Sequence, residues 1–393
     1  MSRTRPRLDS GSSLISCHPK PCITLRDPKT LGGHPRTMEM EINLENLPFD
    51  LDFHPSSPIV ATGLINGRLL LHRYSEDLQL QRLFKIRVHR KSCRAVRFVN
   101  SGSVILTASP DRSILATDVE TGKEIARLEK AHRAAVNRLV NLTETTIASG
   151  DDEGCIKVWD TRQRACCNSF EADEDLVSET TYISDMTYVP DSMQLLASSG
   201  DGTLSLCSLR KNKVQTRSEF AEDALLSVVT MKNGRKVVCG AESGAMLLYS
   251  WGHLEDCSDR FLGHSQSVDK LLKLDEDTVI SGSDDGLIRL VGILPNKIIR
   301  PLAEHAEYPI EGLAFSHDRK YLGSISHDQM LKLWDLQELL DSKQDASSSQ
   351  MVEAESDNDE MDTDPLPGNK RKRTSKGQNT TSAADFFADM DDS

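Results

Sequence analysis

The sequence predicts an all-β fold built from seven copies of one structural unit. Aligned on a residue in a tight turn, the copies follow one another at spacings of 45, 42, 48, 42, 42 and 43 residues. Each copy reads as a short apolar stretch, a turn and a second stretch of alternating apolar side chains, which indicates β-strands. No uncharged apolar run approaches the roughly 18 residues of a membrane-spanning helix, so an integral membrane protein is excluded. The aligned turn residues are Gly67, Arg112, Gly154, Gly202, Gly244, Gly286 and Gln329.

Two copies are the clearest, and they carry a family resemblance. They cover residues 147–160 and 323–335 and end in Trp159-Asp160 and Trp334-Asp335. This pattern resembles the WD-repeat family over roughly residues 40 to 340. The resemblance implies a seven-bladed β-propeller, in which each repeat forms one four-stranded antiparallel blade. The other five copies replace the terminal pair with His72-Arg73, Thr117-Asp118, Cys207-Ser208, Tyr249-Ser250 and Val291-Gly292.

Closure of such a ring requires a partner for the outer edge of the last blade. A blade has two apolar faces that it cannot bury alone, so neighbouring blades must stack. The alternating stretch Met40–Leu44 is the natural partner strand, because the chain after Trp334 soon becomes polar. We therefore expect the propeller domain to span residues 39–340.

Several polar residues that suggest catalysis have a structural explanation in this family. The resemblance implies a buried set in which a histidine between blades meets an acidic turn residue, a strand hydroxyl and the tryptophan indole. A single Ser-His-Asp active site would not recur in several repeats, so we interpret these residues as structural, since buried polar groups must be paired. The sets are His132, Ser149, Glu153 and Trp159; His305, Ser324, Asp328 and Trp334; and, in part, His89, Thr107 and Asp111, and His264, Ser281 and Asp285.

The segment Ile147 to Arg162 carries a more specific signal than a generic repeat. It resembles the box by which many WD-repeat proteins dock on the damaged-DNA-binding adaptor of cullin-4 ubiquitin ligases. The alternative is that Trp-Asp-x-Arg is simply a well-formed repeat, because the box overlaps the repeat consensus. On the docking hypothesis, Arg162 presents a planar five-donor group to the adaptor. The adaptor-binding residues would be Ile147, Glu153, Trp159, Asp160 and Arg162.

Wider comparison along the chain narrows the family. Residues 38–55, 259–264, 293–297 and 382–390 together resemble the WD repeat-containing protein 55 family, most closely its plant members. That resemblance implies a nuclear, often nucleolar, non-enzymatic protein linked to ribosomal RNA processing. Its plant members are also implicated as cullin-4 substrate receptors, while a cytoplasmic location stays open. Residues 1–38 read as a disordered basic leader, either an extension of the gene model or a transit peptide.

The charge of the chain is divided unevenly. The total of −13 consists of +5 in residues 1–38, −7 in residues 341–393 and −11 in the body between them. An acidic body argues against a broad phosphate-binding surface, so we expect protein partners for a monomeric ring and RNA contact only through the C-terminal tail.

The tail, residues 341–393, is predicted to be disordered, because it has too few apolar residues to form a core. Its basic run Lys370, Arg371, Lys372 and Arg373 is interpreted as a nuclear localisation signal, the alternative being a solvated charge run. Phe386 and Phe387 are interpreted as a short docking segment, with an inert tail as the alternative.

The cysteines favour free thiols in a reducing compartment. There are nine, an odd number, and none forms a C-x-x-C pair. Cys17, His18 and Cys22 lack a second half at zinc spacing, and no Gly-rich phosphate loop is present. We therefore expect no cofactor, no metal and no enzymatic activity.

Overall fold

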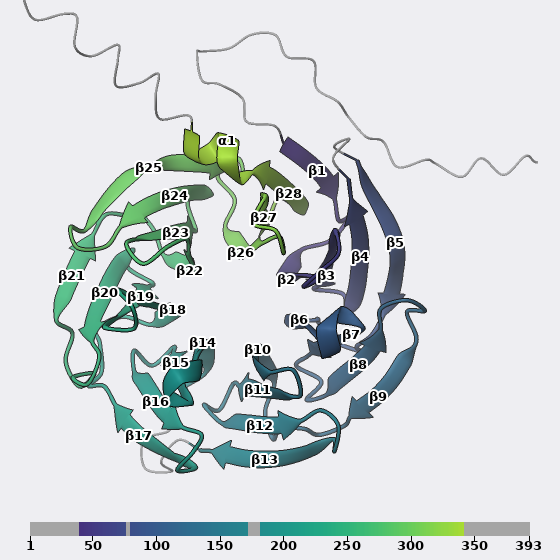
Figure 1. Cartoon of the computed structure of the whole chain (residues 1–393), viewed down its shortest axis with the longest axis horizontal. Coiled ribbons are helices and arrows are strands. Elements are labelled where there is room, and N and C mark those ends of the chain that lie inside the picture. Colours follow the sequence, from purple (N-terminus) through teal and green to yellow (C-terminus); the bar gives the residue numbers. More distant parts are fainter. Residues whose placement is uncertain (1–38, 76–78, 172–180, 342–393) are drawn as a thin grey trace, which may run out of the picture. The chain divides into compact units, whose positions relative to one another are not determined.

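The computed structural model describes residues 39–75, 79–171 and 181–341. Within these ranges the chain forms seven four-stranded antiparallel sheets that stand radially around a central opening (Figure 1). The predicted seven-bladed propeller is thereby confirmed. In every blade the first strand lies next to the opening and the fourth strand lies at the rim.

Blades 1 to 6 each use four consecutive strands of the chain. Blade 1 consists of β2 (Pro48–Phe53), β3 (Ile59–Leu64), β4 (Arg68–Tyr74) and β5 (Leu80–Arg87). Blade 2 consists of β6 (Ala95–Val99), β7 (Val104–Ala108), β8 (Ile114–Asp118) and β9 (Glu124–Leu128). Blade 3 consists of β10 (Val136–Thr143), β11 (Thr146–Asp151), β12 (Ile156–Asp160) and β13 (Ala165–Phe170). Blade 4 consists of β14 (Ile183–Val189), β15 (Gln194–Ser199), β16 (Leu204–Ser208) and β17 (Lys213–Arg217). Blade 5 consists of β18 (Leu225–Met231), β19 (Lys236–Ala241), β20 (Ala245–Ser250) and β21 (Asp259–Leu262). Blade 6 consists of β22 (Val268–Lys273), β23 (Thr278–Ser283), β24 (Leu287–Gly292) and β25 (Lys297–Glu304).

Blade 7 joins the two ends of the domain. It combines β26 (Ile310–Phe315), β27 (Tyr321–Ser326) and β28 (Met330–Asp335) with β1 (Glu39–Asn43), which forms its rim strand. The helical elements within the described ranges are short and include η1 (Asn100–Gly102), η3 (Pro190–Ser192) and α1 (Leu336–Asp341). None of the described helices has the length and apolar character needed to cross a membrane.

The connections between strands define two faces of the ring. Because consecutive strands are antiparallel, their connections alternate between the two ends of a blade. We call the face with the loops from first to second and third to fourth strand the bottom face. The top face then carries the tight turns from second to third strand and the connections between blades.

The repeat alignment marks one backbone position in each blade. The seven aligned residues all lie in the top-face turn between second and third strand, and all have a left-handed φ, between 65° and 84°. Glycine occupies five of these positions, because it adopts this conformation without a steric penalty. Arg112 (φ 68°) and Gln329 (φ 65°) adopt it with a side chain. The spacing found in the sequence is therefore the spacing of these turns.

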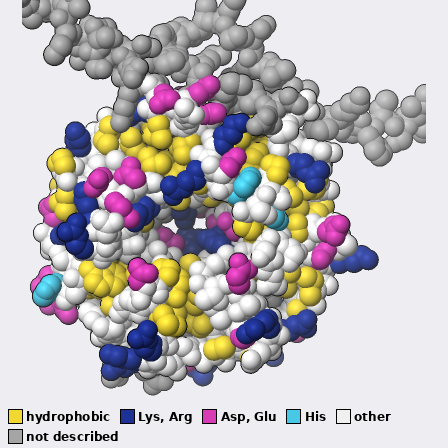
Figure 2. Space-filling model, viewed as in Figure 1, with side chains coloured by type: hydrophobic (Ala, Val, Ile, Leu, Met, Phe, Trp, Pro, Cys, Tyr) yellow, Lys and Arg dark blue, Asp and Glu magenta, His cyan; other side chains and the backbone are white. Residues whose placement is uncertain are grey.

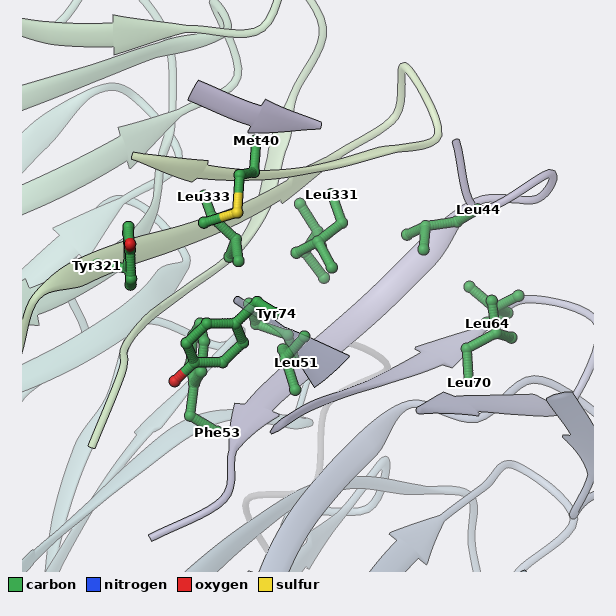
Figure 3. Close-up of a cluster of buried hydrophobic side chains, with 12 residues drawn as sticks. Met40, Leu44, Leu51, Phe53, Leu64, Leu70, Tyr74, Tyr321, Leu331 and Leu333 are labelled. Carbon is green, nitrogen blue, oxygen red and sulfur yellow. The ribbon is translucent and has the colours of Figure 1, made fainter. Parts of the chain in front are cut away.

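The ring closes through β1, as predicted. This strand pairs with β28, with Met40 opposite Leu333, and the amide of Leu44 donates to the carbonyl oxygen of Gln329 at 2.8 Å. Around this junction, apolar side chains of β1, blade 7 and blade 1 form one buried cluster (Figure 3). Both ends of the domain thus contribute to the same core.

Some predicted features lie outside the described residues. These are the leader with Cys17, His18 and Cys22, the basic run 370–373 and the pair Phe386 and Phe387.

Candidate functional site

The docking segment predicted from sequence ends in a bottom-face loop of blade 3. Strand β12 ends at Asp160, whose carboxylate organises the loop that follows. Its Oδ1 atom accepts the backbone N–H groups of Arg162 at 2.8 Å and Gln163 at 3.1 Å. These two hydrogen bonds, helped by the Arg162 guanidinium, lower the pKa of Asp160. Asp160 therefore stays ionised and holds the loop in one shape.

Arg162 extends from this loop into solvent. Its side chain is 69% exposed, and its Nη2 atom lies 3.4 Å from Oδ2 of Asp160. One contact with a carboxylate restrains the side chain while leaving most of its five donors free. Arg164, two residues later, is also exposed, and the described residues offer it no ion pair. The contact with Asp160 thus restrains the side chain of Arg162, whereas Arg164 has no such ion pair within the described residues.

Two of the predicted adaptor-binding residues form the interior behind this loop. Ile147 and Trp159 lie opposite each other on β11 and β12, and they are 2% and 7% exposed. Both pack in the apolar core between blades 2 and 3. They support the loop from inside the blade, so a partner could contact Arg162 directly, whereas these two side chains and the buried Asp160 would act from beneath the surface.

Glu153 does not belong to the same surface. It lies in the top-face turn before β12, whereas Arg162 follows the bottom end of that strand. Five strand residues separate the two ends, which corresponds to roughly 16 Å. Glu153 and Arg162 therefore lie at opposite ends of the blade, so one flat partner surface would not contact both, and a role of Glu153 in adaptor binding stays a prediction.

The equivalent loop of blade 7 has a different form. Asp335 accepts the backbone N–H groups of Gln337 and Glu338, both at 3.0 Å, in the manner of Asp160. The chain then continues as helix α1, and glutamine occupies the position of Arg162. Of these two Trp-Asp blades, only blade 3 presents an arginine.

Buried chains of hydrogen bonds, which we call polar pins, join the top-face connections between blades to the blades that follow them. In blade 3, Trp159 Nε1 donates to Ser149 Oγ at 2.8 Å, and that oxygen lies 2.6 Å from Nε2 of His132. Blade 7 repeats the arrangement, with Trp334 Nε1 2.8 Å from Ser324 Oγ and His305 Nε2 2.7 Å from it. A neutral histidine that accepts from serine and donates through Nδ1 satisfies every member of each chain.

The acid at the end of the chain differs between the two blades. His305 Nδ1 lies 2.8 Å from Asp328 Oδ2, as the repeat alignment predicts. In blade 3 the partner is Asp151 at 2.8 Å, and the assignment of this role to Glu153 is wrong. Asp151 ends β11 two residues after Ser149, so both side chains point to the same face of the strand.

The second and sixth blades keep only part of the pin. His89 lies 2.9 Å from Thr107 and 3.3 Å from Asp111. His264 contacts Ser281 at 2.8 Å, but its Nδ1 atom has no hydrogen-bond partner among the described residues.

The expected link between His264 and Asp285 is absent from the described hydrogen bonds, because Arg289 binds that carboxylate through both Nη atoms, at 2.9 and 2.6 Å. Burial, with a contribution from the Arg289 charge, lowers the pKa of His264 to about 4.

These pins do not have the geometry of a hydrolytic site. Ser149 and Ser324 are fully buried, and each oxygen already accepts an indole N–H, so neither is open to a substrate. His132, Asp151 and Cys155 lie close enough together to surround a metal ion. However, Asp151 already accepts three hydrogen bonds, and burial raises the pKa of the Cys155 thiol to about 11. A protonated thiol is a poor metal ligand.

Charged side chains on the inner strands were not singled out from the sequence. Asp50 on β2 forms an ion pair with Arg97 on β6 at 2.6 Å and accepts the Val96 amide at 2.8 Å. Asp185 on β14 accepts the Val228 amide of β18 at 3.1 Å. Each contact joins one blade to the next. For blade 1, the acidic residues at alternate positions of β2, Asp50 and Asp52, were the available signal.

A cavity of about 370 Å³ opens on the central channel. Arg138, Lys270 and Glu311 are among its lining residues, and Figure 2 shows basic and acidic side chains together in the central opening. Glu311 also accepts a hydrogen bond from His327 at 2.7 Å, which raises the pKa of that histidine. The opening therefore presents mixed charge rather than a uniform anion or cation site.

Comparisons with known proteins cover this same propeller. The family model described as WDR55 matches residues 39–339, from β1 into α1. WD repeat-containing protein 55 of Arabidopsis thaliana is 61% identical over 303 residues, or 77% of this chain and 84% of that protein. The Dictyostelium discoideum homolog is 39% identical over 296 residues (75% and 70%), and the Homo sapiens protein is 35% identical over 315 residues (78% and 81%).

Proposed function

The chain belongs to the WD repeat-containing protein 55 family, and from this premise we propose that it is a nuclear scaffold which docks on the damaged-DNA-binding adaptor of cullin-4 ubiquitin ligases. In this proposal the bottom face binds the adaptor, and the rest of the ring binds a client protein. No bond is made or broken by the propeller itself. Its contribution is to hold two proteins at a fixed distance and orientation.

The observation that carries the proposal is the conformation of Arg162. Its guanidinium is exposed, and its loop is fixed by the hydrogen bonds to Asp160. An arginine held in position loses little side-chain entropy on binding, which favours it as the centre of an interface. The buried pair Ile147 and Trp159 keeps this loop on a rigid base.

Arg162→Ala tests this directly, with Arg164→Ala as a matched control from the same loop. Binding of the purified adaptor to the full chain should weaken by about tenfold or more in Arg162→Ala and change little in Arg164→Ala. Both side chains are exposed, so thermal unfolding should be unchanged in both variants. Equal adaptor binding by wild type and Arg162→Ala would remove the ligase proposal.

The second candidate is a nucleolar factor in ribosomal RNA processing without a ubiquitin-ligase role. The basic run Lys370–Arg373 and the pair Phe386-Phe387 in the sequence favour it. Deletion of residues 365–393 should then displace the protein from nucleoli and alter the pre-rRNA profile. Normal position and profile after this deletion, together with a lost adaptor contact in Arg162→Ala, would favour the scaffold alone.

A further inference from the structure

The top face has an acidic part and a basic part, which the net charge of the whole chain does not reveal. The described top-face loops between residues 152 and 329 hold twelve acidic side chains and no lysine or arginine. These loops are residues 152–155, 171 with 181–182, 200–203, 218–224, 242–244, 263–267, 284–286, 305–309 and 327–329. By contrast, residues 82–133, which build much of blades 1 and 2, carry twelve basic and five acidic side chains.

Five of these basic residues form what we call the basic crescent. They lie in three top-face connections, residues 88–94, 109–113 and 129–135, and all five are exposed. No ion pair joins any of them to an acidic residue within the described ranges. The members of the crescent are Arg90, Lys91, Arg112, Lys130 and Arg133.

Backbone contacts join the three connections into one surface. The Arg90 amide donates to Asp111 Oδ2 at 3.2 Å, and the Ala131 amide donates to the Arg112 carbonyl oxygen at 2.9 Å. The Arg112 guanidinium reaches the carbonyl oxygen of Arg133 at 3.4 Å. Residues that are 43 positions apart in the chain are therefore neighbours on a rigid framework.

Two acidic residues lie in the three connections, and one of them, Asp111, is already bound within the ring. Asp111 is bound by His89, by Ser113 and by the Arg90 amide, and these bonds lower its pKa although burial opposes the shift. The charge of Asp111 serves the turn and the inter-blade pin. The other acid, Glu129, is exposed in the third connection. The five basic side chains outnumber this one exposed carboxylate, so the crescent keeps a net positive charge for a ligand outside the ring.

We propose that the basic crescent binds a short acidic segment of a partner protein. A carboxylate-rich peptide matches the exposed guanidinium and ammonium groups, since arginine pairs with carboxylates through two donors at once. A short peptide carries negative charge only over its own length, so its charge need not extend beyond the crescent. This matters because Asp152 and Glu153 of the next blade border the crescent, and Arg94 at its edge already contacts Asp152 at 3.3 Å.

Nucleic acid fits the same surface less well. A duplex carries a charge about every 1.7 Å along its axis, so it would extend from the crescent over the acidic loops of the neighbouring blades. Single strands gain affinity by stacking bases on aromatic side chains, and the three connections contain no Phe, Tyr or Trp. Charge and composition together favour the acidic peptide.

The test uses two fluorescent probes with matched charge. One is an octaglutamate peptide with eight side-chain carboxylates, and the other is a nine-nucleotide oligouridine with eight linking phosphates. Binding to the full chain is followed by fluorescence anisotropy. The triple variant Arg90→Glu, Arg112→Glu, Arg133→Glu should weaken peptide binding by about tenfold or more. The matched control is Arg210→Glu, Lys211→Glu, Lys213→Glu, which reverses three exposed charges at the bottom end of blade 4 and should change binding by less than about twofold.

Three results would overturn the proposal. They are tighter crescent-dependent binding of the oligouridine than of the peptide, equal peptide binding by wild type and the triple variant, and absence of peptide binding at low salt. The pair Lys91→Glu, Lys130→Glu provides a second reversal if the triple variant does not fold. Arg162→Ala should leave peptide binding intact, so failure here and failure of the adaptor contact can be told apart.

Discussion

The Nδ1 atom of His132 lies 2.8 Å from the carboxylate of Asp151, while Glu153 makes no hydrogen bond to this histidine. In blade 7 the equivalent acid, Asp328, lies in the turn itself. In blade 3 the acid lies two positions earlier in the repeat, at the end of β11. There it accepts the amides of Glu153 and Cys155 as well, at 3.0 and 2.8 Å.

Asp151 should therefore be far more important for stability than its acidic neighbour. We expect Asp151→Ala to lower the free energy of unfolding by about 3 kcal/mol, because it leaves the His132 N–H and two amides without their acceptor. Glu153→Ala should cost less than about 0.5 kcal/mol, since that side chain is exposed. Urea denaturation followed by tryptophan fluorescence measures both. Equal losses in the two variants would contradict the assignment.

The sequence allowed the fold to be predicted because the repeat is a period of turns. Each aligned residue marks a left-handed turn, and alternation at Met40–Leu44 marks the closing strand. The partner of His132 was missed because the repeat consensus places the acid in the turn. The two-residue periodicity of β11, which puts Asp151 beside Ser149, was the available signal.

Other features depend on which side chains the fold brings together. Asp285 follows the consensus position, yet Arg289 on the adjoining strand binds it and His264 loses its partner. The basic crescent arises because three connections from two blades meet on one face. Regional net charge does not reveal such an arrangement, because it averages over both faces of the ring.

Gln329 occupies a turn position that favours glycine. Its φ is 65°, and its amide and carbonyl groups bond to Ser326 and Leu44, so the backbone contacts do not require the side chain. Gln329→Gly should raise the free energy of unfolding by about 0.5 kcal/mol, because relief of the left-handed strain exceeds the added chain entropy. Gly154→Ala, at the same position of blade 3 with φ 75°, should lower it by about 1 kcal/mol. A destabilised Gln329→Gly would show that its side chain contributes to the turn.

Met40 should be essential for closing the ring. It is 2% exposed and packs with residues of blades 7 and 1 (Figure 3). Glu41 on the same strand is exposed. We expect Met40→Ala to lower the free energy of unfolding by about 2 to 4 kcal/mol, and Glu41→Ala by less than about 0.5 kcal/mol. Proteolysis of the native protein should also cut the N-terminal end of the domain faster in Met40→Ala. Similar stability of the two variants would argue that β1 is held by backbone pairing alone.

His72 gives the ring a sensitivity to acid. It occupies the position of the blade tryptophan, is 1% exposed, and its Nδ1 atom has no hydrogen-bond partner within the described residues. Burial, reinforced by the positive charges of Arg82 and Lys85, lowers the pKa of His72 to about 4. In the unfolded chain the pKa returns to about 6.5.

The direction of the pH effect follows from this difference. Between pH 6.5 and pH 4 the unfolded chain binds a proton on His72 that the folded chain does not, so stability present above pH 6.5 is lost as the pH falls. The loss from this one group should reach about 2 kcal/mol between pH 7 and pH 5. His72→Leu should reduce the pH dependence of the free energy of unfolding by that amount, whereas His253→Leu, at an exposed histidine, should follow the wild-type curve. If His72→Leu kept the full wild-type slope, the acid sensitivity would have to come from other buried groups, such as His264 with its own pKa of about 4.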